Sequence, residues 1–290
     1  MSETKISRRE ILGGAAALGT AAMMKSAEAQ NPPAAPPATA PTLPPGTAAP
    51  GSVVGKEITF QSGDTTLKAY FAQPTNGTPK AGILVIHEIW GLTEHIRDVT
   101  RRFAAQGYYA LAPDFFTREG APQLDPQKRD EMMKFIASIP DRRVVADAEA
   151  GVSYLKTAGA QKVGSVGFCM GGLYSYLLAT KSTQLSAAVD FYGRIIYPET
   201  SENKPESPLD LSLNLKCPLL ANYGETDQSI TVAHVEQLKA KLAQGQQPWK
   251  INVYPGAGHA FFNDTRPSFN AGAAKDAWSE VTAFFKKHLS

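Results

Sequence analysis

The sequence predicts one α/β domain with a mostly parallel eight-stranded sheet and helices on both faces. Strand-like and helix-like runs alternate over most of the chain, which is typical of this class. The strand-like run GILVIH at 82–87 is continuously apolar up to its last residue, as expected for a strand buried on both faces. The turn residues SGD at 62–64 separate strand-like runs at 57–61 and 66–72, so an antiparallel hairpin is expected to open the sheet.

The remaining elements follow in order along the chain. Further strands are predicted at 108–113, 162–168, 187–192, 218–224 and 250–255. Helices, bounded by residues such as Gly107 and Pro140, are predicted at 95–106, 125–138, 141–158, 170–181, 231–243 and 271–288. Parallel strands need crossover connections, and such sheets bind ligands beyond the C-terminal ends of their strands. The residues directly after each strand are therefore the candidates for a functional site.

The N-terminal residues 1–29 have the pattern of a twin-arginine export signal. Arg8 and Arg9 precede an apolar run at 11–24, and the small-residue sequence AEA follows at 27–29. The apolar run is too short to span a bilayer, so no stable membrane anchor is expected after cleavage. The alternative is a chance arginine pair in a disordered tail. The export signal predicts folding in the cytosol and a periplasmic location.

Residues 30–52 form a Pro/Ala-rich segment in which eight of 23 residues are proline. Such a segment cannot bury a core, so a disordered or extended linker is expected before a domain at 53–290. The net charge of +2 does not favour nucleic acid or an anionic membrane as a partner. Oligomeric state does not follow from the sequence, and a monomer is compatible with it.

Three chemically distinct residues follow three predicted strands in an informative order. Cys169, Asp227 and His259 have the nucleophile–acid–histidine order of α/β-hydrolases. The sequence GFCMG matches the Gly-x-Ser-x-Gly turn of those enzymes with cysteine in place of serine, and Gly167 and Gly171 supply its small flanking residues. A histidine can take the proton of a thiol, and a carboxylate can orient that histidine.

The oxyanion of such a reaction needs two N–H donors, and we expect them from Met170 at the start of a helix and from Ile89 after the third strand. Each residue of the triad also has a structural interpretation. Cys169 alone could be a buried core thiol, Asp227 a turn residue or helix cap, and His259 a surface histidine. Their joint occurrence at strand ends favours catalysis. Cys217 opens a strand, so it is predicted to lie in the core, away from Cys169 and not disulfide-bonded to it.

From about residue 55 to the C-terminus the chain resembles the dienelactone hydrolase (carboxymethylenebutenolidase) family. The stretches that carry the resemblance are IHEIWGL, APDFF with TRE, GFCMGG, YGETD and GHAFFND. The resemblance implies the α/β-hydrolase fold and cleavage of an ester or lactone without a metal or organic cofactor. It implies that Glu88 contacts the thiol and helps to deprotonate it when substrate binds, and that Arg118 holds a substrate carboxylate. Alternatively, Glu88 caps a helix and Arg118 is a solvated loop residue.

The chain departs from the family pattern beside the histidine. Asn263 stands where the best-known members carry a second arginine, and Ala260 stands where they carry serine. Loss of that cationic anchor predicts a weaker preference for an anionic lactone. The polar run YPETSENKPESPLD at 197–210 also extends one loop. Further candidates for the substrate pocket, which are equally compatible with core positions, are Trp90, Tyr192 and Phe261.

The sequence therefore favours an exported hydrolase that acts on a small-molecule ester or lactone through a Cys169–His259–Asp227 triad and an acyl-enzyme. Two alternatives remain open. One is a carboxylesterase or thioesterase of broad range. The other is a non-catalytic binding protein with the same fold.

Overall fold

A computed structural model describes residues 44–290 of the chain, apart from residues 123 and 126. The predicted export signal and the first part of the predicted linker lie outside the described residues. Both stay predictions from the sequence.

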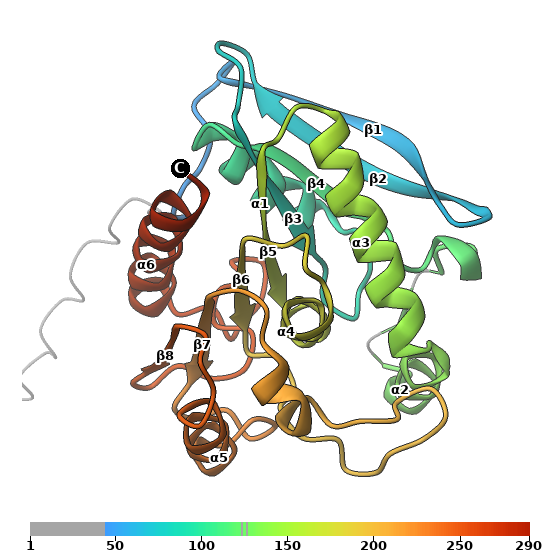
Figure 1. The fold of residues 1–290 in the computed structure, drawn as a ribbon, viewed down its shortest axis with the longest axis vertical. Coiled ribbons are helices and arrows are strands. Elements are labelled where there is room, and N and C mark those ends of the chain that lie inside the picture. The colour runs from blue at the N-terminus through green and yellow to red at the C-terminus, as the bar shows by residue number, and fades with distance from the viewer. Residues whose placement is uncertain (1–43, 123, 126) are drawn as a thin grey trace, which may run out of the picture. The chain divides into compact units, whose positions relative to one another are not determined.

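The domain is built on one eight-stranded sheet, as the sequence predicts (Figure 1). The strand order is β1-β2-β4-β3-β5-β6-β7-β8. The pairs β1·β2 and β2·β4 are antiparallel, and all other neighbours are parallel. The strands are β1 (Val53–Ser62), β2 (Thr65–Pro74), β3 (Ala81–Ile86), β4 (Tyr109–Pro113), β5 (Lys162–Phe168), β6 (Ala187–Phe191), β7 (Leu219–Gly224) and β8 (Trp249–Tyr254).

Helices cover both faces of this sheet. The α-helices are α1 (Glu94–Ala105), α2 (Arg129–Ser138), α3 (Asp141–Thr157), α4 (Met170–Lys181), α5 (Val232–Leu242) and α6 (Ala271–Leu289). One hydrophobic core joins the sheet to α1 and α6, with Phe103 and Phe285 buried in it. The second core joins the opposite face to α3, α4 and α5, with Leu155, Leu177 and Leu238 buried there. This arrangement is the α/β-hydrolase fold that the sequence predicts.

The central strands and α4 have no exposed face, which explains why they are mainly apolar. Every residue of β3 is buried, and α4 is buried along all but its last residue. A helix that is apolar on all sides is stable only when it is surrounded by other elements. The sheet, α3 and the 3-10 helix η2 (Pro208–Asn214) surround α4. The nucleophile candidate therefore lies at the N-terminus of a rigidly packed helix.

The last part of the predicted linker packs against the domain. Residues 44–52 form two turns, closed by Thr47 N–H to Pro44 O at 3.2 Å and by Ser52 N–H to Ala49 O at 3.1 Å. A Cβ on Gly46 would lie 2.3 Å from the ring of Trp278 on α6. The structure thus differs here from the expected extended or disordered linker, because this segment covers the apolar ring of Trp278.

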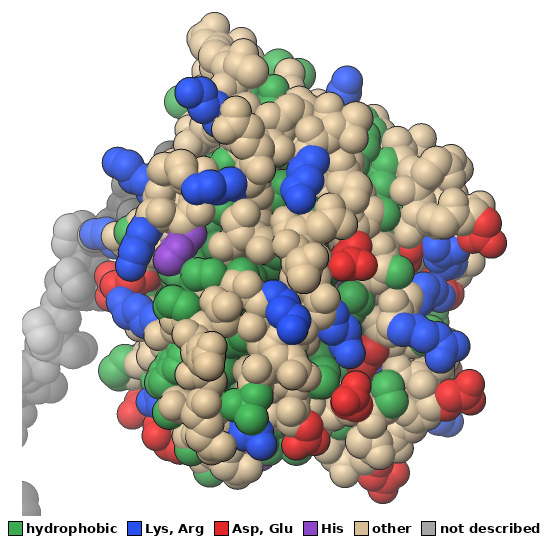
Figure 2. Space-filling view, viewed as in Figure 1, with side chains coloured by type: hydrophobic (Ala, Val, Ile, Leu, Met, Phe, Trp, Pro, Cys, Tyr) green, Lys and Arg blue, Asp and Glu red, His purple; other side chains and the backbone are tan. Residues whose placement is uncertain are grey.

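Short elements were not predicted from the pattern. The 3-10 helices η1 (Thr117–Glu119) and η2 are too short or too irregular to show a helical period, and α2 begins at Arg129 rather than at residue 125. Basic and acidic side chains are interspersed on the face shown in Figure 2. Within the part of the chain that the structure describes, no helix has an apolar stretch long enough to cross a membrane.

Candidate active site

The candidate nucleophile lies in a strained turn between β5 and α4. Cys169 has φ 55° and ψ −113°, a conformation that non-glycine residues seldom adopt. Its N–H donates to Phe191 O at 3.0 Å, and its carbonyl accepts from Leu173 N–H at 3.2 Å. Bonds to β6 and to α4 therefore hold the turn, and the thiol stands at the C-terminal edge of the central strands.

Two glycines allow this turn to form. A Cβ on Gly167 would lie 1.8 Å from Gly171 O, and a Cβ on Gly171 would lie 2.1 Å from Ile86 O of β3. Real Cβ atoms do not approach backbone oxygens so closely, so only glycine fits at either position. The first turn of α4 is consequently in direct backbone contact with β3, and the Gly-x-Cys-x-Gly pattern is explained by this packing.

The structure brings the three predicted triad residues together. His259 Nε2 lies 3.2 Å from Cys169 Sγ, and His259 Nδ1 lies 2.7 Å from Asp227 Oδ2. The other oxygen of Asp227 accepts N–H bonds from Ser229 at 2.7 Å and Ile230 at 3.0 Å. Asp227 is thus both a turn residue and the partner of the histidine, and the turn bonds direct its second oxygen toward the ring.

The electrostatics of this group favour a charged imidazolium. Burial alone would lower the pKa of His259, but its hydrogen bonds and charge interactions with Asp227 and Cys169 outweigh burial and raise this pKa to about 10. Burial likewise opposes ionisation of Asp227, yet the bond from His259 and two backbone N–H groups lower the pKa of this carboxyl. A carboxylate that faces a protonated histidine is the resulting state.

Glu88 lies beside the triad in a buried position. It is 3% exposed, and its Oε2 accepts from Asn263 Nδ2 at 2.6 Å. Asn263 Oδ1 accepts from both the backbone N–H and the hydroxyl of Thr265, so the amide can present only its NH₂ group to Glu88. Burial raises the pKa of Glu88, against smaller opposing contributions that include His95 and Asn263. Asn263 therefore holds Glu88 without supplying a positive charge.

His87 holds the same loop in place, and the sequence analysis did not assign it a role. Its Nε2 accepts from Phe115 N–H at 3.1 Å, so Nδ1 carries the proton and donates to Glu88 O at 2.6 Å. Burial lowers the pKa of His87, which keeps the ring neutral and able to accept at Nε2. Its place at the end of β3, directly before Glu88, is the signal that could have identified it.

A pocket of about 610 Å³ opens over the thiol and the histidine. Both predicted oxyanion donors, Met170 and Ile89, line it, as do Trp90 and the fully buried Tyr192. Most of the remaining lining is apolar and comes from α2, α4 and the loops after β7 and β8, namely Met132, Met133, Ile136, Leu173, Ile230 and Pro267. The chemistry of this lining suits an apolar group next to the reacting carbonyl.

Three predicted pocket residues lie outside this lining. Phe261 is buried in the core, with its ring centroid 5.4 Å from that of Tyr192, and Asn263 lies beneath Glu88. Arg118 Nη2 bonds Asp147 Oδ1 at 2.9 Å and Ser62 O at 3.2 Å. Asp147 is only 1% exposed and requires a cationic partner, which explains why Arg118 turns toward the β1–β2 hairpin.

The arginines that line the pocket are Arg194 and Arg266. Arg266 lies over the ring of Trp90, 4.5 Å from its centroid. Arg194 follows β6 at the edge where the other site residues gather, so its strand-end position was visible in the sequence. Arg266 lies seven residues after His259, and no pattern in the sequence distinguished it.

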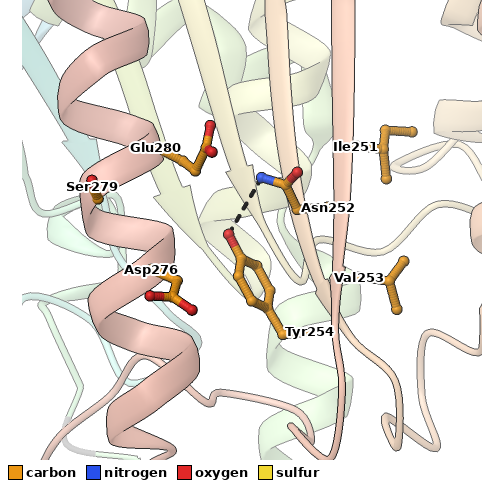
Figure 3. A pocket seen from close by; sticks show the side chains of 7 residues that line it. All are labelled: Ile251, Asn252, Val253, Tyr254, Asp276, Ser279 and Glu280. Carbon is orange, nitrogen blue, oxygen red and sulfur yellow. Dashed lines mark hydrogen bonds between the residues drawn. The ribbon is translucent and has the colours of Figure 1, made fainter.

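A second groove lies between the edge strand β8 and α6, and Figure 3 shows it closely. Asn252 and Tyr254 face the helix, where they bond each other at 3.3 Å, whereas Ile251 and Val253 point the other way. Tyr254 OH also donates to Asn222 Oδ1 at 3.0 Å. Because Cys169, Asp227 and His259 lie elsewhere, the groove is a feature of the sheet edge.

The fold and the cysteine turn define the class of this protein as an α/β-hydrolase. Within that class, the family model "Dienelactone hydrolase family" matches residues 67–289. The chain belongs to the dienelactone hydrolase family, whose carboxymethylenebutenolidase-like hydrolases act on lactone or ester bonds.

Similar proteins span nearly the whole domain. A "Putative carboxymethylenebutenolidase" of Methylorubrum extorquens is 34% identical over 290 residues, covering 99% of this chain and 95% of that protein. A protein of the same name from Escherichia coli K12 is 35% identical over 240 residues, covering 82% and 88%. The crystal structure of a "Putative Dienelactone Hydrolase" from Klebsiella pneumoniae superposes with a TM-score of 0.76 at 34% identity, covering 81% of this chain and 99% of that one.

We expect Asp227→Asn to lower the pKa of His259 toward the ordinary value of about 6.5, because the ring loses its charged partner. In the wild type, His259 binds its proton more tightly in the folded chain than in the unfolded one. The tighter binding stabilises the folded state. This contribution to the free energy of unfolding is complete below a pH of about 6.5 and is lost as the pH rises through about 10. NMR titration of the ring measures the pKa directly. Glu225→Gln, on the same turn, is the control and should leave it unchanged; an unchanged midpoint in Asp227→Asn would contradict the expectation.

Proposed function

We propose that this protein hydrolyses an ester or lactone through a covalent acyl-enzyme on Cys169, with His259 as general base and acid and Asp227 as its orienting partner. The observation that carries the proposal is the continuous path from Asp227 Oδ2 to His259 Nδ1 at 2.7 Å and from His259 Nε2 to Cys169 Sγ at 3.2 Å. Nothing in a binding protein requires these three groups at hydrogen-bond distance.

The proposed reaction has two halves. In the first, His259 Nε2 holds the proton of Cys169, the sulfur attacks the substrate carbonyl carbon, and the alkoxide leaves with that proton from His259. In the second, His259 takes a proton from water, the hydroxide attacks the thioester carbonyl, and the acid departs, which leaves that proton on His259 Nε2 beside the free sulfur. Asp227 keeps the ring in the orientation that presents Nε2 to the sulfur in both halves.

The proposed oxyanion site consists of the N–H groups of Met170 and Ile89. Met170 is the first residue of α4, where backbone N–H groups have no partner within the helix. His87 supports the second donor. It binds Glu88 O, and in a planar trans peptide the N–H of Ile89 points opposite to that oxygen. Fixing the carbonyl therefore fixes the direction of the N–H, which is what preorganised stabilisation of an oxyanion requires.

A carboxylesterase of broad range is the second candidate function. The apolar lining favours it, as does the absence of Arg118 and Asn263 from that lining among the described residues. A neutral ester needs no cationic anchor, whereas a carboxylate-bearing lactone does. Arg194 and Arg266 are the groups that could bind such a carboxylate in this pocket.

We further propose that the protein works after export to the periplasm. The support is the combination of Arg8-Arg9, the apolar run at 11–24 and the AEA sequence at 27–29. With Arg8→Lys and Arg9→Lys together, the full-length chain should accumulate in the cytoplasmic fraction, while the wild type is recovered from the periplasm. Equal periplasmic recovery of the two chains would contradict twin-arginine export.

Cys169→Ala should reduce turnover of 4-nitrophenyl acetate by about 10⁴-fold or more, because it removes the only atom that forms the covalent bond. Cys217→Ala is the matched control and should retain activity, since Cys217 is buried in the core near η2. Intact-mass spectrometry of the quenched wild type should detect an acetyl adduct on Cys169. Turnover by Cys169→Ala close to that of the wild type would overturn the proposed mechanism.

Arg118→Ala should leave the KM for a carboxylate-bearing dienelactone unchanged while lowering the midpoint of urea unfolding, because Asp147 loses its cation. Arg194→Ala should have the opposite profile, with a raised KM and little change in stability. Steady-state kinetics and urea titrations distinguish the two residues. If Arg118→Ala instead raised KM, the carboxylate-anchor role that the family resemblance implies would apply to Arg118 after all.

A further inference from the structure

The polar run at 197–210 has no part in the triad, yet it contacts one wall of the pocket. It comprises most of the loop between β6 and η2, which passes beside α2 in Figure 1, and the first three residues of η2. A reciprocal pair of backbone bonds between Ser201 and Lys204, at 3.0 and 3.1 Å, closes a turn at its tip. This turn places Asn203 and Lys204 at the junction of α2 and α3.

Asn203 binds the C-terminal end of α2. Its side-chain NH₂ donates to Ser138 O at 3.1 Å and to Ala137 O at 3.4 Å. Its backbone carbonyl accepts from Asp141 N–H at 2.9 Å, at the first residue of α3. The last carbonyls of a helix and the first N–H groups of the next have no partners within those helices. Asn203 therefore binds two of these carbonyls and one of these N–H groups.

Lys204 connects the same junction to the helix that begins at the nucleophile. Its ammonium group donates to Ile139 O at 2.9 Å, Asp141 Oδ1 at 2.7 Å and Tyr174 OH at 2.6 Å. These three bonds use all its donors. Tyr174 lies on α4, and Tyr197 OH, from the loop itself, completes the bonding of Asp141 at 2.7 Å. The Lys204 side chain is only 12% exposed, so water competes little for these bonds.

Helix α2 depends on this clasp of Asn203 and Lys204 because its own packing is sparse. Of its residues whose burial is described, Met132 alone is buried, and Met133 is 39% exposed. No side chain caps its N-terminus. Nevertheless α2 supplies Met132, Met133 and Ile136 to the pocket wall. An exposed helix with few core contacts keeps a defined position only if its ends are held.

We propose that Asn203 and Lys204 are positioning residues that hold α2 against the active site, so that the protein accepts esters with a long or bulky apolar acyl group. The proposal rests on the hydrolase function proposed above. The acyl chain would extend from the carbonyl at Cys169 along the α2 side chains, whose unbranched methionines adapt to apolar groups of irregular shape. The loop would then determine substrate size without touching the substrate.

The test compares 4-nitrophenyl octanoate with 4-nitrophenyl acetate in the full-length protein and in Lys204→Met. We expect the ratio of kcat/KM values, octanoate over acetate, to fall about tenfold in Lys204→Met, the scale on which apolar contacts discriminate acyl groups. Lys181→Met is the matched control, because Lys181 pairs with Glu206 of the same loop at 3.7 Å but does not touch α2. It should keep the wild-type ratio.

A purely structural role would reduce both activities in parallel and leave the ratio unchanged, so a ratio equal to or above that of the wild type overturns the proposal. Should Lys204→Met fail to fold, Asn203→Ala, which keeps the buried Asp141 paired, decides the question by the same ratio. Cys169→Ala is measured alongside. If it retains activity, the proposed function fails, whereas an inactive Cys169→Ala with an unchanged ratio in both clasp variants rejects this inference alone.

Discussion

The backbone contact between the first turn of α4 and β3 is the constraint on which the rest of the site depends. Gly171 lies so close to Ile86 O that no side chain fits between them. This contact forces the chain to reverse sharply at Cys169, which accounts for its positive φ. It also sets the thiol and the start of α4 beside the loop that carries Glu88 and Ile89, so one packing contact brings together most of the candidate site.

Buried carboxylates organise the surroundings of that centre, each by a different kind of partner. Asp227 is bound by two backbone N–H groups and a histidine, which favours its charged form. Glu88 is bound by a neutral amide, so burial raises its pKa. Asp147 forms an ion pair with Arg118. The partner of each carboxylate therefore decides whether its charged form is favoured.

Much of the fold was predictable because each central element has a strong local signal. The strand β5 and helix α4 occupy the expected residues 162–168 and 170–181, since continuous apolar runs flank an unmistakable glycine turn. The convergence of Cys169, Asp227 and His259 was predictable for a related reason: parallel strands bring their C-terminal ends to one edge, so residues distant in sequence converge there. The elements that were not predicted, η1 and η2, are short and show no helical periodicity of apolar residues.

The sequence alone determined the fold class, the family and the identity of the thiol, histidine and carboxylate that meet at the sheet edge, because strand order and glycine spacing specify them locally. Only the tertiary structure decided how the long polar side chains are used. Arg118 turns to Asp147, Arg194 and Arg266 line the pocket, and Lys204 joins α2, α3 and α4. A flexible cationic side chain takes the buried anion or carbonyl within its reach, and which one that is depends on the packing of the whole domain.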